Sequence, residues 1–282
     1  MKEEKIKKPY KEFTKKFIQR KIAVLSLLFI VLLVFIGIFQ PITINPDFAD
    51  YDNLLAPPSS AHWFGTDEYG RDLFNRIIVG TRISLGVSLS SVFIGALIGT
   101  LLGLVAGFYG GKIESIIMRS CDVLFSFPGL LLAIGIVAII GPGVINVVIA
   151  ISIYGIPSFT RIVRSSTLSL NKLLYIEASK SIGVSNSRIL FIHIFPGTIP
   201  TLIVTLTMRI GTAIISAASL SFLGFGASPT KPDWGAMLST GRDYIGLAPH
   251  MLFYPGLMIF LTVLAFNLLG DGLRDTLDPK LN

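Results

Sequence analysis

The stretch from Thr160 to Ile199 reads TRIVRSSTLSLNKLLYIEASKSIGVSNSRILFIHIFPGTI and lies between two long apolar runs. Apolar residues recur at roughly helical spacing from Leu173 to Ala178 and again from Ser187 to Ile194. Gly183 stands between these two parts, where a C-cap glycine would end the first helix. The pattern predicts two short helices that form a rigid, basic hairpin between membrane spans.

The end of this stretch contains two prolines, Pro196 and Pro200. Because proline cannot donate a backbone hydrogen bond, we expect them to stop the second helix before the next span begins. The alternative interpretation of the whole stretch is an amphipathic loop that rests on anionic lipid, which its lysines and arginines would favour.

The composition of the whole chain is that of a membrane protein. Of the 282 residues, 52% are hydrophobic and 15% are charged, whereas soluble domains carry about 25% charged residues. The net charge of +7 is grouped at the ends of apolar runs, which favours membrane lipid and not nucleic acid as the surroundings. One cysteine and three scattered histidines predict no disulfide framework and no metal site.

The fold class that we predict is all-α, integral to the membrane, with six transmembrane helices. The first apolar run is about as long as a bilayer core requires, and the fourth is short. The first is not followed by a small-residue cleavage site, so we expect it to be retained. The expected spans are 22–39, 83–108, 121–140, 144–159, 201–223 and 251–269.

The basic residues predict the orientation. With the N-terminus inside, 18 of the 24 lysines and arginines fall in inner segments and five in outer segments. Positive charge collects on the cytoplasmic side of membrane proteins. We therefore expect both termini and the 160–199 hairpin to be cytoplasmic.

The expected outer segment between the first two spans has its own pattern. Thr66 could cap a short helix with acidic residues in its first turn. Asp67 with Arg71 and Asp72 with Arg76 are four residues apart, a spacing that favours surface ion pairs. The helix could simply lie solvated on the headgroups. Alternatively, Asp67, Arg71 and Asp72 could frame the outer mouth of a pathway that receives a soluble partner.

Signatures of catalysis are scarce. The nearest approach to a phosphate-binding loop is Gly110-Gly111-Lys112, which lacks the first glycine and the Ser or Thr after lysine. The chain contains no His-Glu-x-x-His helix and no Gly-x-Ser-x-Gly elbow. We expect no catalytic residue, and no nucleotide or other cofactor bound by this chain.

Two features lie within the spans. Arg209 is a charge inside the fifth span, at a cost of about 2.5–3.5 kcal/mol on insertion scales, so we expect it to face a wet cavity or a carboxylate, such as that of a passing peptide. Snorkelling or pairing with Asp122 is the alternative. Gly95, Gly99 and Gly103 repeat every four residues, which predicts close helix packing, preferably within the chain.

The stretch from Thr160 to Ile199 and several other runs of the sequence resemble a known family. Glu177-Ala178-Ser179, then Gly183, then Ile194-Phe195-Pro196 is similar to the EAA loop of ABC importer permeases, written Glu-Ala-Ala, Gly, Ile-Leu-Pro. The chain departs from that motif at Ser179 and Phe195. Further runs resemble the C-type subunit of dipeptide, oligopeptide and nickel permeases: HWFGTDEYGRD (62–72), GFYGG (107–111), SFP (126–128), SLSFLG (219–224), PDWG (232–235) and FNLLGDGLRD (266–275).

The resemblance implies a type I importer in the bacterial cytoplasmic membrane. Its expected partners are a homologous B-type permease subunit, two ABC ATPase subunits that carry ATP and Mg, and an extracytoplasmic substrate-binding protein. By carry-over, Glu177, Ala178 and Gly183 belong to a coupling helix, and Ser179, Ile194 and Pro196 complete its motif. The implied domains are 1–21 cytoplasmic, 22–39 first span, 40–82 extracytoplasmic with an interfacial helix, 83–270 type-1 permease domain with the loop at 160–199, and 271–282 tail.

The function that we predict is ATP-driven uptake of di- or oligopeptides by alternating access. A nickel or metal-chelate importer is the alternative within the class. An ion-coupled secondary transporter is the alternative from another class, but such proteins place acidic or histidine residues inside their spans. Here only Asp122, at a span boundary, is of that kind.

Overall fold

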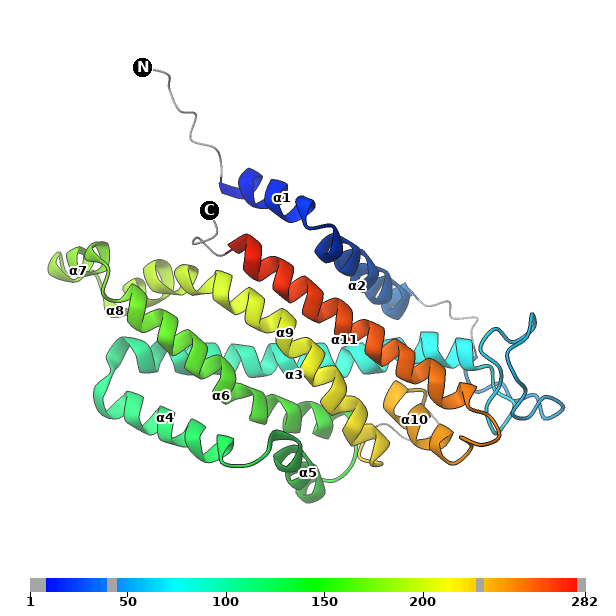
Figure 1. Cartoon of the computed structure of the whole chain (residues 1–282). Coiled ribbons are helices and arrows are strands. Elements are labelled where there is room, and N and C mark those ends of the chain that lie inside the picture. The colour runs from blue at the N-terminus through cyan, green and yellow to red at the C-terminus, as the bar shows by residue number, and fades with distance from the viewer. Residues whose placement is uncertain (1–8, 40–44, 227–230, 278–282) are drawn as a thin grey trace, which may run out of the picture.

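The computed structural model describes residues 9–39, 45–226 and 231–277, and within these residues the chain is helices joined by loops (Figure 1). Five helices are long and apolar enough to cross a membrane, or six if one bent pair counts as a span. The elements are α1 (Pro9–Gln19), α2 (Lys21–Phe39), α3 (Leu73–Tyr109), α4 (Gly111–Phe125), α5 (Gly129–Ile140), α6 (Val144–Leu170), α7 (Leu174–Ser181), α8 (Asn186–Arg188), the π-helical η1 (Ile189–Ile194), α9 (Phe195–Phe222), α10 (Trp234–Arg242) and α11 (His250–Leu277).

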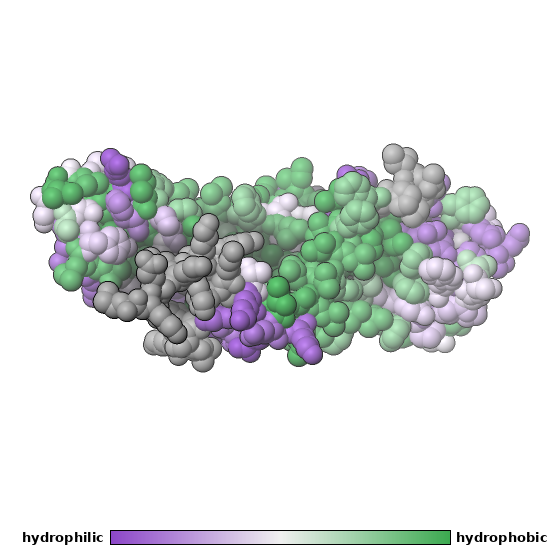
Figure 2. Space-filling model, turned by 90° about the horizontal axis from the view of Figure 1, so that it is seen from above, coloured by the Kyte–Doolittle hydropathy of each residue, from purple (hydrophilic) through white to green (hydrophobic). Residues whose placement is uncertain are grey.

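The long helices α3, α6, α9 and α11 pack along one another between two ends of the molecule. The first, which we call the hairpin end, carries α7 and α8, and the second, the loop end, carries residues 45–72 and α10 (Figure 1). Seen from above, apolar side chains cover the middle of the molecule, hydrophilic ones gather at the loop end, and the two kinds are mixed at the hairpin end (Figure 2). This distribution is the one that a bilayer-spanning bundle requires, because only the ends meet water.

The closest helix pair is α3 and α6, and glycines make it possible. A Cβ on Gly99 would lie 2.6 Å from Cβ of Phe159, and one on Gly103 would lie 2.6 Å from the carbonyl oxygen of Thr160. These distances leave no room for a side chain larger than hydrogen. The predicted close packing of the glycine repeat within the chain is confirmed.

The expected third span, 121–140, is wrong as a single straight helix. α4 and α5 meet at an angle of 89° across residues 126–128. Pro128 explains the break, because its ring disfavours helical backbone at Phe127 and it has no N–H to continue the ladder. The first arm, α4, begins at Gly111, ten residues before the predicted start of the span at 121.

The boundaries of the fourth and fifth spans are also corrected. α6 continues past Pro157 to Leu170 instead of ending at residue 159. The prediction that Pro196 and Pro200 would stop a helix is wrong, since residues Asn186–Phe222 form one continuous helical rod. Pro196 falls in the first turn of α9, where a missing N–H costs little. The hairpin therefore comprises residues 171–194, and this range keeps the name below.

Candidate functional site

The hairpin is fastened to the helix bundle by buried aliphatic side chains. Ile176 in α7 and Ile189 and Ile194 in η1 have 0% of their surface exposed. They form one cluster with Leu104 of α3 and Val163 of α6. A cluster of this kind holds the hairpin at a fixed angle to the spans, because a close-packed interior does not deform smoothly.

The turn inside the hairpin is set by Gly183. Its φ of +80° lies in the left-handed region. Its N–H donates to the carbonyl of Lys180 at 3.1 Å, and the N–H of Val184 donates to that of Ser179 at 3.1 Å. These two bonds define a Schellman motif, and the predicted C-cap glycine is confirmed.

The outward face of α7 is apolar and exposed. Leu174 at its start and Ile182 just after its end are 82% and 80% exposed. Glu177 and Ala178 are exposed between them, and Ser179 is partly exposed and donates to the carbonyl of Tyr175 at 2.8 Å. Large apolar side chains this bare, on an element fixed from behind, indicate a surface for a partner.

The predicted coupling residues thus fall into two groups. Glu177, Ala178 and Gly183 are exposed on the hairpin, and Pro196 is exposed at the start of α9. Ile194 is buried and belongs to the cluster that fastens the hairpin. The buried Ile176 completes that cluster and was not among the predicted site residues, although its place in the helical apolar pattern could have revealed it.

Ion pairs brace the base of the hairpin. Nε of Arg164 in α6 donates to Oε1 of Glu114 in α4 at 2.6 Å. One turn earlier, Nη2 of Arg161 lies 2.5 Å from Oδ1 of Asp122. Both pairs tie α4 to α6, so Asp122 is ion-paired with Arg161 and not with Arg209.

At the loop end, Asp67 organises the outer segment. None of residues 45–72 is helical, so the expected interfacial helix is wrong. Oδ1 of Asp67 accepts from the backbone N–H groups of Tyr69 and Arg71, each at 2.9 Å. Its Oδ2 lies 2.6 Å from Nε of Arg71. The predicted pair of Asp67 and Arg71 is confirmed, but Asp67 is buried and holds a turn closed where we had expected a solvated helix.

The second predicted pair, Asp72 with Arg76, is wrong. Asp72 is the N-cap of α3, accepting from the N–H of Asn75 at 2.8 Å, and it lies 2.9 Å from Nδ1 of His62. Helical capping takes precedence because Asp72 directly precedes the first helical residue. The buried Arg76 instead reaches Oδ1 of Asp47 at 3.1 Å and Oδ2 of Asp67 at 3.5 Å.

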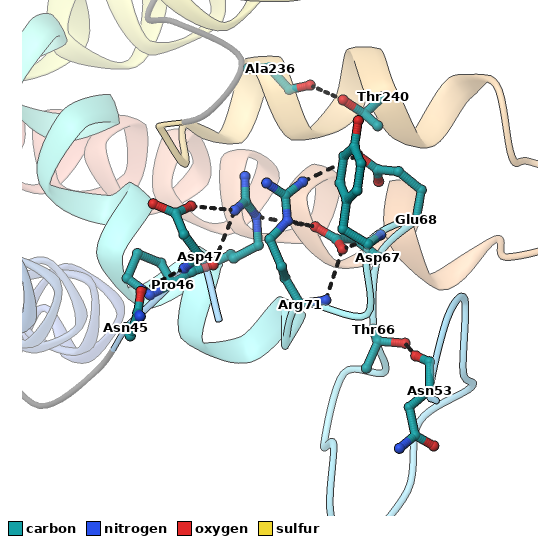
Figure 3. Close-up of polar contacts among 12 residues, drawn as sticks. Asn45, Pro46, Asp47, Asn53, Thr66, Asp67, Glu68, Arg71, Ala236 and Thr240 are labelled. Atoms are coloured by element: carbon teal, nitrogen blue, oxygen red, sulfur yellow. Dashed lines mark hydrogen bonds and ion pairs between the residues drawn. The ribbon is translucent and has the colours of Figure 1, made fainter. Parts of the chain in front are cut away.

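The contacts that Asp67, Arg71 and Arg76 make belong to one network of charges, drawn in Figure 3. Asp67 and Arg76 are its most buried members. We call it the loop-end ion cluster: Asp47, Asp67, Glu68, Arg71 and Arg76. Asp47 precedes the others by about twenty residues and no spacing rule pointed to it.

Glu68 is the least well satisfied member of the loop-end ion cluster. Its Oε1 accepts from Arg71 at 3.2 Å. Its Oε2 is buried, with no hydrogen-bond partner among the residues that the structure describes. Burial raises the pKa of this carboxyl above its ordinary value. Glu68 therefore responds to pH in a range where an exposed glutamate is already ionised.

Arg209 lies at the middle of α9, which runs from residue 195 to residue 222. This is deeper in the helix than the sequence predicted, because α9 starts six residues before the expected span. One Nη donates to Oγ of Ser158 in α6 at 2.5 Å. Ser158 is buried and was not predicted, since the facing register of two helices cannot be read from either one alone.

The chain matches two family descriptions. Residues 99–282 match "Binding-protein-dependent transport system inner membrane component", and residues 8–58 match "N-terminal TM domain of oligopeptide transport permease C". Curated relatives named "Glutathione transport system permease protein GsiD" are 52% identical in Pectobacterium atrosepticum and 53% identical in Escherichia coli O6:K15:H31. Each alignment covers 100% of this chain and 94% of the relative.

Solved structures share the fold at low sequence identity. One, of the MetNI methionine ABC transporter in inward facing conformations, has a TM-score of 0.58 and 17% identity over 72% of this chain and 96% of its own. Another, of an amino acid ABC transporter with histidines, has a TM-score of 0.56 and 18% identity over 71% and 94%. The chain belongs to the binding-protein-dependent transport system inner membrane components, as a multi-pass permease subunit of a type I ABC importer that works with ATPase and substrate-binding partners.

Proposed function

We propose that this permease imports small peptides of the size of glutathione, and that it forms the pathway together with a homologous, non-identical B-type permease. The relatives' printed name and their identity of 52–53% over the whole chain support this substrate class. The match to the N-terminal domain of permease C supports a partner of another type. The chain itself is non-catalytic in this scheme, with ATP and Mg held by two ATPase subunits.

The exposed apolar face of α7 is the observation that carries the coupling role. Leu174 and Ile182 would enter a groove on one ATPase, with Glu177 and Ala178 between them. Because the hairpin is fastened by buried isoleucines, movement of the ATPase would pass to the spans instead of being absorbed by a flexible loop. Alternating access follows when the two ATPases approach and separate.

The hairpin end then lies in the cytoplasm and the loop end outside, as the distribution of basic residues favours. The binding protein would be received at the loop end. Trp63 and Tyr69 are 64% and 51% exposed there, and aromatic side chains are enriched where proteins meet. Asp67, Arg71 and Asp72 would act by holding this surface in shape, since their side chains are turned to one another and to the backbone.

The test is a reconstituted complex of both permeases and both ATPases, stimulated by the loaded binding protein. We expect glutathione-loaded binding protein to stimulate ATP hydrolysis and uptake. Leu174→Asp should abolish both and reduce co-purification of the ATPase subunits. Leu247→Asp is the matched control for ATPase co-purification, because Leu247 is 77% exposed but lies between α10 and α11, away from the hairpin.

Two results would overturn parts of the proposal. Full ATPase co-purification and stimulation in Leu174→Asp would remove the coupling role from α7. Stimulation by a nickel chelate alone, with none by peptides, would keep the importer and replace its substrate.

A further inference from the structure

One face of α9 is polar along the middle of the bundle. Thr205, Arg209, Thr212 and Ser216 follow one another at intervals of three or four residues. At 3.6 residues per turn they lie on a single face. All four are exposed or partly exposed. We call them the polar face of α9.

The hydroxyl groups of this face do not show whether it contacts lipid or water. Thr205 donates to the carbonyl of Thr201 at 2.8 Å, and Ser216 to that of Thr212 at 3.1 Å. A hydroxyl satisfied by its own helix can face lipid. Arg209 cannot be satisfied in this way, because its guanidinium carries a charge and five N–H donors.

The depth of Arg209 excludes an easy escape to water. It is about equally far from Phe195 and Phe222, which is roughly 20 Å along the axis from either end of α9. Charged side chains at such a depth face a bundle interior or a water-filled cavity. The polar face therefore lines an interior that this subunit does not close alone.

A hydrogen bond to α6 positions the guanidinium of Arg209, and Asp122 does not neutralise its charge. Among the residues that the structure describes, Ser158 on α6 accepts the one side-chain hydrogen bond that Arg209 donates, at 2.5 Å. Asp122 is engaged with Arg161. Two turns beyond, Tyr154 of α6 and Ser216 of α9 share a hydrogen bond of 2.8 Å, which fixes the distance between these two helices.

We propose that Arg209 is a carboxylate-binding residue of the translocation pathway, positioned by Ser158, and that it selects solutes with a free carboxylate. A guanidinium binds a carboxylate through two parallel N–H donors, and such a charge-assisted bond is stronger than a neutral one. The inference rests on the proposed peptide import and names the group of the peptide that the pathway recognises.

The experiment compares uptake of glutathione with that of its diamide, in which both carboxylates are blocked. Complexes in proteoliposomes receive saturating binding protein loaded with either compound, after its affinity for each has been measured separately. Arg209→Met should lower glutathione uptake by about tenfold or more. Diamide uptake should change little, Arg209→Lys should recover part of the loss, and Ser158→Ala should give a smaller loss.

Thr207→Val serves as control, because Thr207 lies on the opposite side of α9 and bonds only to its own helix. It should leave both uptake rates within about twofold. Co-purification of the partner permease and the ATPases shows whether a variant loses uptake because it no longer recognises the solute or because the complex does not assemble.

Four results would overturn the inference. Equal loss of glutathione and diamide uptake in Arg209→Met would make the residue structural. Failure of Arg209→Met to assemble with the partner permease would assign the charge to a carboxylate of that subunit. Wild-type uptake of both compounds at one rate would remove the selection while leaving peptide import intact. A wild-type complex that imports neither would overturn the proposed function, and this inference with it.

Discussion

The two ends of the molecule hold their projecting parts by opposite means. At the hairpin end, fully buried isoleucines fasten α7 and η1 to the bundle, and the outward surface is apolar. At the loop end, buried charges fold residues 45–72 onto α3. The stability that an apolar cluster contributes falls in proportion to the atoms removed. A buried charge that loses its partner lowers the free energy of unfolding by a large amount in one step.

The largest effect should come from removing the central carboxylate of the loop-end ion cluster. Asp67→Ala leaves Arg71 and Arg76 buried with fewer partners and opens the turn that Asp67 closes. Breaking a buried pair in this way costs about 3–5 kcal/mol. Thermal unfolding of the purified complex, with proteolysis of residues 45–72, measures the loss. Asp52→Ala, an exposed neighbour, should change stability by less than about 0.5 kcal/mol, and equal losses would contradict the comparison.

A somewhat smaller effect is expected from the buried anchor of the hairpin. Ile176→Ala leaves a cavity under α7 and should cost about 2–4 kcal/mol. Leu174→Ala removes a side chain of similar size from the exposed face and should leave the unfolding temperature unchanged while weakening ATPase association. Equal effects of the two variants in both assays would mean that the buried and the exposed side chains of α7 do not have separate roles in stability and in ATPase binding.

The turn at Gly183 should have a lesser effect. Gly183→Ala places a Cβ in the left-handed region, at a cost of about 1–2 kcal/mol. Gly183→Asn should lose less, since asparagine tolerates this conformation better. Cysteine crosslinking between α7 and the ATPase would report the changed angle of the hairpin. A larger loss with asparagine than with alanine would mean that φ is not what selects glycine here.

The smallest effect should be a pH dependence confined to the loop end. Burial raises the pKa of Glu68, so the folded chain keeps a proton that the unfolded chain releases. Its contribution to stability is fully present below the ordinary glutamate pKa and is lost as pH rises through the raised pKa. The protection of residues 45–72 from hydrogen exchange, relative to the intrinsic exchange rate at each pH, should therefore fall over that interval in wild type and not in Glu68→Gln. Protection of the hairpin should show no such fall, because its anchors do not titrate.

The sequence predicted the hairpin end better than the loop end for a physical reason. Helical periodicity and a C-cap glycine are local signals, so the first short helix and the turn at Gly183 could be read directly, whereas the second helix runs on into α9. The contacts of Arg76 with Asp47 join residues 29 apart, and no local rule selects among several nearby carboxylates. The i, i+4 spacing correctly predicted the pair of Asp67 and Arg71. It wrongly predicted a pair of Asp72 and Arg76, because Asp72 caps the N-terminus of α3.

Prolines were the other source of error. Pro128 does break a helix, but Pro157 and Pro200 lie inside α6 and α9. Membrane helices tolerate proline because neighbouring groups can satisfy the carbonyls that it frees. Arg209 was predicted as a charge within a span, but Ser158, which holds it, belongs to a helix 51 residues earlier and could not be found from α9 alone.

The unbroken rod from Asn186 to Phe222 has a mechanical consequence. It contains η1, which is locked under α7, and it carries Arg209 halfway along α9. Measured from Arg209, this stretch extends roughly 35 Å to Asn186 and roughly 20 Å to Phe222. A tilt of about 10° about Arg209 would displace the two tips by about 6 Å and about 3 Å, and Arg209 itself would turn while barely shifting. A force applied at the hairpin would thus swing the far tip in the opposite direction and rotate the guanidinium in place.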